Sequence, residues 1–238
     1  PINPPSSLGY LGHNWRVSKV LRTTATQSLS VSFTVGLYGT AFGAAGIAAG
    51  FSLIQVCLLS LLTFSGASQF AVVGVIGAGG SAFSAVTTAS LLGIRNGLYG
   101  LRMAPILQLK GAKKVIAAQV TIDESTGVAI GQEEHGLDAM KHGFWLTGFG
   151  VYIFWNLFTL LGALGAQAMG NPSAWGLDAA VPAAFLGLVW PRLLGRRERA
   201  LAASAMTLAI VLSPVISAGL PIIATALLAV LFGWKVRS

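Results

Sequence analysis

A short polar segment interrupts a long apolar block and carries the side chains best suited to bind a small solute. Residues 63–69 read TFSGASQ inside the uncharged stretch from Thr23 to Ile94. If this block spans a membrane, a helix break survives only where protein buries it or where it lines a wet cavity. Its free N–H groups and helix-end dipole suit a carboxylate, although a plain extracellular turn is the alternative. The candidate binding residues are Phe64, Ser65, Gly66, Ser68 and Gln69.

Acidic side chains close to apolar segments form a second candidate group. Asp178 lies near the start of an apolar stretch. A carboxylate at the bilayer centre costs roughly 2.5–3.5 kcal/mol, whereas at a helix N-terminus it acts as a cap, and both interpretations stay open. Asp123 and Glu124 are adjacent, so they point in different directions on a helix. If one of these three acids carries a proton, burial raises its pKa and transport depends on pH.

Patterns that would indicate enzymatic chemistry are weak. His135, Asp138 and His142 have the spacing i, i+3, i+7, which could place three metal ligands on one helix face, but a solvated polar helix explains them better. A protease based on Ser65 or Ser68 would need a histidine base, and no histidine lies in an apolar block. The sequence also lacks a P-loop, a GxSxG elbow and an HExxH motif. We predict no enzymatic activity, no metal site and no cofactor.

A stripe of glycines precedes the polar segment. Its members follow one another at spacings of 3, 4, 3 and 4, which places them on one face of a helix. Small residues at such a spacing let a second helix backbone approach closely in lipid. The stripe therefore predicts a close crossing inside the chain, with a sliding surface or subunit contact as the alternative. The five residues are Gly36, Gly39, Gly43, Gly46 and Gly50.

The composition decides which elements position these residues. The chain has 238 residues, of which 54% are apolar and only 9% are charged. A soluble domain usually carries about 25% charged residues. These values exclude a soluble globular enzyme, a disordered chain and a nucleic-acid-binding domain, and they favour an all-α, polytopic helical membrane protein.

The formal net charge of +8 comes from basic residues at the edges of the apolar blocks. Clusters of Lys and Arg beside membrane segments mark the cytoplasmic side. We therefore expect both termini and the loop Arg192–Arg199 to be cytoplasmic, and we expect the bilayer, not nucleic acid, as the surrounding partner. The remaining clusters lie at 16–22, 95–114 and 235–237.

The pass along the chain predicts a cytoplasmic tail at 1–22 and one transmembrane domain at 23–238. Because the basic clusters at 16–22 and 95–114 should both lie on the cytoplasmic side, an even number of crossings separates them. We therefore expect two crossings plus a half-penetrating element before Arg95, with the break near 64–69. Thr121 and Glu124 have capping-box spacing and predict a helix start. In total, the sequence predicts about six membrane crossings with one or two partial helices. The uncharged stretch 143–177 is predicted to hold one long helix and the start of a second, which runs over about 175–190. A pair of helices is predicted within 200–234, hinged between Pro214 and Pro221.

Five short strings in order along the chain resemble the AzlC family of branched-chain amino acid permeases. The family His is Asn96 here and the family Phe after Asp178 is Ala179, so the specificity of a relative need not transfer. The matching strings are FSGASQFA at 64–71 (family FSGxxQFA), IRNGLYG at 94–100 followed by AP at 104–105 (LRHLLYG…AP), TIDES at 121–125 (TDES), WLTG at 145–148 with Trp155 and TLLG at 159–162 (WxxG…W…TxxG), and GLDAAVPAAF at 176–185 (GLDFxxPxxF).

The resemblance implies export of valine, leucine, isoleucine, methionine or related amino acids across the cytoplasmic (inner) membrane, with a small AzlD-type membrane partner. Without an ATPase motif, any coupling would be to protons or to the substrate gradient itself. The residues alone indicate only a helical transporter, and a higher oligomer is compatible with them. A passive channel subunit and a non-transporting assembly subunit are the alternative functions.

An amino acid at the polar break would need three kinds of partner. Its carboxylate would take the donors of the break, or else Arg95, although the basic cluster around Arg95 indicates a cytoplasmic edge. Its ammonium group would use unwound carbonyls, with Asp123 or Asp178 as an alternative. Its side chain would need an apolar wall, for which the candidates are Phe64, Phe70 and Trp155.

Overall fold

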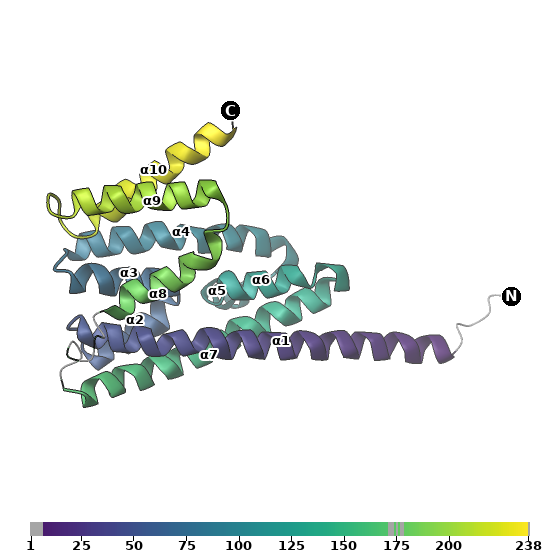
Figure 1. The fold of residues 1–238 in the computed structure, drawn as a ribbon. Coiled ribbons are helices and arrows are strands. Elements are labelled where there is room, and N and C mark those ends of the chain that lie inside the picture. The colour runs from purple at the N-terminus through teal and green to yellow at the C-terminus, as the bar shows by residue number, and fades with distance from the viewer. Residues whose placement is uncertain (1–6, 171–173, 175, 177–178, 238) are drawn as a thin grey trace. The chain divides into compact units, whose positions relative to one another are not determined.

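A computed structural model describes residues 7–170, 174, 176 and 179–237 as helices joined by turns (Figure 1), and no strand occurs among these residues. The predicted all-α fold is confirmed. The elements are α1 (Ser7–Ala48), α2 (Leu53–Thr63), α3 (Gly66–Gly77), α4 (Ala82–Leu107), α5 (Ala112–Gln119), α6 (Asp123–Gly131), η1 (Glu133–His135), α7 (Leu137–Ala168), α8 (Ala180–Val189), η4 (Trp190–Arg192), α9 (Arg196–Leu212) and α10 (Leu220–Arg237).

The chain divides into two compact units. The first comprises Pro1–Leu37 and Asn96–Trp155, and the second comprises Tyr38–Arg95 and Asn156–Ser238. The long helices α1, α4 and α7 contribute residues to both units. Each unit is described below by itself.

Within the described residues, two helices are long and apolar enough to cross a membrane by themselves, Ser18–Ala48 and Leu137–Ala168. A span needs about 20 residues, so the shorter apolar helices α2 and α3 reach only part of the way. The partial helices of the predicted fold are therefore present, while the count of six crossings stays a prediction. Helix α1 begins at Ser7, so most of the predicted N-terminal tail is helical.

In the first unit, α1 and α7 run parallel and in close contact. A methyl group placed on Gly143 would lie 3.2 Å from the methyl carbon of Thr24, and one placed on Gly36 would lie 3.0 Å from the backbone carbonyl carbon of Phe154. Between these two contacts along α1, the Ser32 hydroxyl donates to the carbonyl oxygen of Thr147 at 3.3 Å. Glycine thus lets the two backbones approach, and buried hydroxyls connect them.

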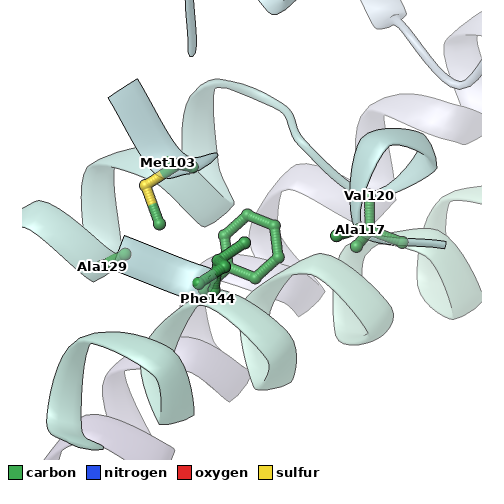
Figure 2. Close-up of a cluster of buried hydrophobic side chains, with 6 residues drawn as sticks. Met103, Ala117, Val120, Ala129 and Phe144 are labelled. Atoms are coloured by element: carbon green, nitrogen blue, oxygen red, sulfur yellow. The ribbon is translucent and has the colours of Figure 1, made fainter. Parts of the chain in front are cut away.

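Helices α4 to α7 enclose an apolar cluster in the first unit. Figure 2 shows the ring of Phe144 between Met103 and Ala129 on one side and Ala117 and Val120 on the other. Leu107 completes the cluster. The buried aromatic ring contributes the largest apolar area here, so this cluster holds the short helices α5 and α6 against α7.

The predicted capping box at Thr121 and Glu124 is shifted by one residue, because Ser125 and not Glu124 bonds the backbone at the start of the helix. Helix α6 begins at Asp123, after Ile122 as the N-cap. The Ser125 side-chain oxygen accepts from the Ile122 N–H at 3.0 Å and donates to the Val120 carbonyl oxygen at 2.7 Å. Thr121 instead donates to the Ala117 carbonyl oxygen at 2.7 Å and closes the end of α5.

In the second unit, α1 ends in a Schellman turn at Gly50, whose φ is +88°. The Phe51 N–H reaches back to the Gly46 carbonyl oxygen at 3.0 Å, and the Gly50 N–H reaches that of Ile47 at 3.0 Å. This pattern requires a left-handed residue, for which glycine has no side-chain penalty. Gly50 therefore lies beyond the helix and is not part of the predicted helical stripe.

The C-terminal part of the second unit contains α8, α9 and α10. Helix α8 begins at Ala180, five residues after the predicted start at 175. Helices α9 and α10 pack against each other, and residues 213–219 join them, which confirms the predicted hinge between Pro214 and Pro221. The Thr88 hydroxyl donates to the Gly219 carbonyl oxygen at 3.4 Å and ties this hinge to α4.

Candidate functional site

The predicted helix break is present and confined to two residues, Phe64 and Ser65, between α2 and α3. Phe64 has a φ of +29°, a left-handed conformation that costs a residue with a side chain roughly 1–2 kcal/mol. Its side chain is only 4% exposed. The conformation is held because the surrounding second unit buries the ring, and a strained, buried turn of this kind is common at functional sites.

Polar side chains around the break are buried and bonded to neighbouring helices. The Ser65 hydroxyl donates to the Ser68 side-chain oxygen at 3.1 Å, and the Ser68 hydroxyl donates to the Ala89 carbonyl oxygen of α4 at 2.8 Å. These bonds hold the start of α3 against α4. The two hydroxyls therefore stabilise the geometry of the break, and they would affect a bound ligand only indirectly, through that geometry.

Gln69 closes the end of α2 from across the break. Its side chain is 0% exposed, and its amide nitrogen donates to the carbonyl oxygens of Leu59 at 3.4 Å and Ser60 at 3.2 Å. The Ser60 carbonyl is one of the last four of α2, where intrahelical donors run out. The Ser60 hydroxyl in turn donates to the Thr159 side-chain oxygen of α7 at 3.3 Å. Gln69 thus positions the two half-helices.

The first turn of α3 has no side-chain cap. Its N-cap residue is Ser65, whose hydroxyl makes no capping bond to the helix. The N-terminal end of a helix carries partial positive charge and N–H groups that favour an anion. Gly66, the first residue of α3, adds no side chain that would keep a ligand from this backbone. The break can therefore receive a carboxylate through backbone groups, while its side chains are used for support.

The other sequence-predicted residues are distributed over both units. Arg95 lies half-buried on α4 in the second unit. Asp123 and Glu124 are half-buried in the first turn of α6, and Trp155 is buried on α7, all in the first unit. Their roles in coupling and as an apolar wall stay predictions. Asp178 lies outside the described residues.

The alternative interpretation, in which three metal ligands share one helix face, is wrong. His135 belongs to η1, whereas Asp138 and His142 belong to α7, and Gly136 separates the two elements with a φ of +90°. The three side chains therefore do not share one helix face. Among the described residues, no group of three metal-type side chains comes together.

Three members of the glycine stripe contact other helices inside the chain. Gly36 meets Phe154 in the first unit, and Gly43 and Gly46 meet Thr159 and Val56 in the second. Gly39 is buried on α1 as well. The contacts of Gly36, Gly43 and Gly46 agree with the predicted internal crossing.

An apolar cavity of about 550 Å³ lies in the second unit, next to the break in sequence. The sequence singled out only one of its lining residues as a wall, Phe70, which follows Gln69. Pro182 and Phe185 occur in the AzlC-like string but carried no spacing signal, and the residues from α9 gave none. The lining residues are Phe70, Ala71, Gly74, Val75, Ala78, Pro182, Phe185, Ala209, Ser213, Ala218, Gly219, Pro221 and Ile222.

Replacing Gln69 by Ala is expected to destabilise the fold, because it leaves carbonyls of Leu59 and Ser60 without their donor. The cost of such a loss is about 1–3 kcal/mol. Thermal unfolding in detergent, followed by size-exclusion profiles, measures it. Gln167 is exposed on α7, and the matched Gln167→Ala variant should unfold like the wild type. Equal stability of Gln69→Ala and Gln167→Ala would show that the two bonds contribute nothing.

The fold and the break define a class: a polytopic helical membrane protein with a broken helix buried at its polar segment. The chain belongs to the AzlC protein family, whose model matches residues 30–169. That match begins within α1 and ends just after α7, so it includes the break.

Two relatives are also membrane proteins by name. An uncharacterized membrane protein of Archaeoglobus fulgidus is 32% identical over 202 residues, which cover 81% of this chain and 85% of that protein. The inner membrane protein YgaZ of Escherichia coli K12 is 28% identical over 156 residues, or 63% of each chain. No solved structure matches the chain. This protein is therefore a membrane protein of a family associated with transport.

Proposed function

We propose that the protein is a secondary transporter that exports branched-chain or related neutral amino acids, and that it is not an enzyme. The observation that carries the proposal is the buried break at Phe64 and Ser65, where α3 starts without a side-chain cap. Membrane transporters use half-helix ends of this kind to bind a substrate carboxylate. The ammonium group would take carbonyls of the same break.

The charge pattern and the family support a proposal for the location and assembly of the transporter. We place it in the cytoplasmic membrane with both termini inside, because the basic clusters then lie on one side. A small AzlD-type subunit would be its partner. Proton coupling through Asp123, Glu124 or Asp178 belongs to the same proposal.

Counterflow in proteoliposomes tests this function. Vesicles loaded with unlabelled valine should accumulate labelled valine when they contain the protein with its small subunit, and they should not accumulate labelled aspartate or lysine. The small subunit is left out in a parallel preparation to show whether it is needed for the exchange. Absence of valine exchange in both preparations, with correctly folded protein, would contradict amino acid transport.

A further inference from the structure

The cavity in the second unit is a partly open space between helices. Its floor is formed by buried residues of α3, namely Phe70, Ala71 and Val75. Its walls come from α8, α9 and α10, and its rim includes the exposed residues Ala78 and Ser213. A volume of about 550 Å³ falls in the range of small-molecule sites.

The chemistry of the lining selects an apolar occupant. No charged side chain lies among the lining residues, and Ser213 is their one hydroxyl. Burying an ionised group against such walls without a partner is costly, whereas burying an aliphatic group is favourable. A zwitterion can therefore use this space only with its apolar side chain against the walls and its charged groups toward backbone or water.

Phe70 lines the cavity and lies close to the break in sequence. Its side chain is 1% exposed and lies between two other rings, with centroid distances of 5.6 Å to Phe42 and 6.1 Å to Phe185, both in edge-to-face contact. The next residue toward the N-terminus is Gln69, which bonds the end of α2. Phe70 thus belongs to the wall of the apolar cavity and directly follows a residue that bonds across the polar break.

Four of the lining residues lie at helix ends. Ala78 follows the end of α3, and Ser213 follows the end of α9, while Ala218 and Gly219 precede α10. In the topology predicted from charge, these ends face away from the cytoplasm, because α9 begins at the cytoplasmic Arg196 and α4 leads toward the cytoplasmic Arg95 cluster.

We propose that this cavity is the exit-side pocket for the apolar side chain of the exported amino acid, with Phe70 as the barrier between it and the break. The proposal rests on the proposed function and adds which part of the protein determines selectivity among amino acid substrates. The small residue Ala209 on α9 sets the width of the pocket, so a large side chain there should exclude large substrates before small ones.

Substitution at Ala209 tests selectivity. Ala209→Phe should reduce counterflow of labelled leucine by about tenfold or more while alanine exchange falls much less, which is the usual scale for a few methylene groups in an apolar pocket. The matched control is Ala203→Phe, at an exposed position on the same helix. Equal leucine-to-alanine ratios in Ala209→Phe and the wild type would overturn the assignment while leaving amino acid transport intact.

A labelling experiment tests occupancy independently of transport. Ser213→Cys is made in a Cys57→Ala background, which removes the single natural cysteine. An impermeant maleimide added outside intact cells should label Cys at this position, and leucine should slow the reaction several-fold whereas aspartate should not. Leucine protection in a protein that fails valine counterflow would keep the pocket and reject the transport proposal. Protection by the small subunit alone, protection by lipid alone, or labelling only from inside would overturn the pocket.

Discussion

Leucine in place of Gly43 or Gly162 is expected to prevent the folded protein from accumulating. A side chain on Gly43 would collide with the Thr159 carbonyl oxygen and lie 2.7 Å from the Ala163 backbone nitrogen. A side chain on Gly162 would collide with the Thr40 carbonyl oxygen and lie 2.7 Å from the Thr40 Cα. Because backbone and not a flexible side chain is in the way, we expect a loss of roughly 3 kcal/mol or more.

The crossing is reciprocal, which makes both substitutions informative. Residues 40–46 of α1 and 159–165 of α7 share the pattern TxxGAxG. In each helix, the glycine that follows the threonine by three positions faces the threonine carbonyl of the other helix. The two variants should therefore be impaired to a similar extent.

A matched control on α7 separates this contact from general helix effects. A side chain on Gly165 would meet no atom within 4 Å. Gly165→Leu should therefore give wild-type yield and a wild-type thermal midpoint in detergent, measured by size-exclusion profiles after heating. If Gly43→Leu and Gly162→Leu behaved like Gly165→Leu, the close crossing would be absent from the protein in its membrane.

Valine in place of Gly66 is expected to abolish transport with little loss of folding. Gly66 is the first residue of α3, where the proposed carboxylate site uses backbone N–H groups. A branched side chain there keeps the ligand from this backbone. A hydrogen bond to a charged group contributes about 1.5–3 kcal/mol, so affinity should fall about tenfold or more.

Valine counterflow and thermal stability are measured on the same preparations of Gly66→Val. The control is Gly97→Val, because Gly97 is exposed on α4 and a side chain there would meet no atom within 4 Å. Normal counterflow in Gly66→Val at matched expression would mean that the break is only a turn and that substrate binds elsewhere.

The sequence was sufficient to predict the class of protein and the place of the break. Long uncharged blocks leave helices in a bilayer as the stable fold, and the polar TFSGASQ segment cannot continue an apolar helix without a cost. The hinge at Pro214–Pro221 was predictable for a similar reason, since proline lacks the N–H that a helix interior needs. These features depend on neighbours along the chain.

Features that depend on residues far apart in the sequence were not predictable. The sequence suggested that Ser68 and Gln69 offer donors to a substrate, but tertiary packing brings Ala89 and Ser60 to them and uses these donors for support. One local feature was also mispredicted, since Ser125 and not Glu124 bonds a backbone N–H at the start of α6, and that N–H belongs to Ile122 and not to Thr121. Hydrogen-bond partners are set by three-dimensional proximity, which spacing alone does not define.

For the glycine stripe and the cavity, too, the sequence predicted one part and the tertiary structure determined the other. Spacing alone placed Gly43 on a face made for close approach, and the tertiary structure decided that the partner is α7, at Thr159 and Ala163. The sequence singled out Phe70 as an apolar wall but did not predict its pocket with Phe185 and Ala209, because these residues come from separate helices and are ordinary apolar side chains. A cavity is the space that packed helices leave unfilled, so only the packing of those helices determines it.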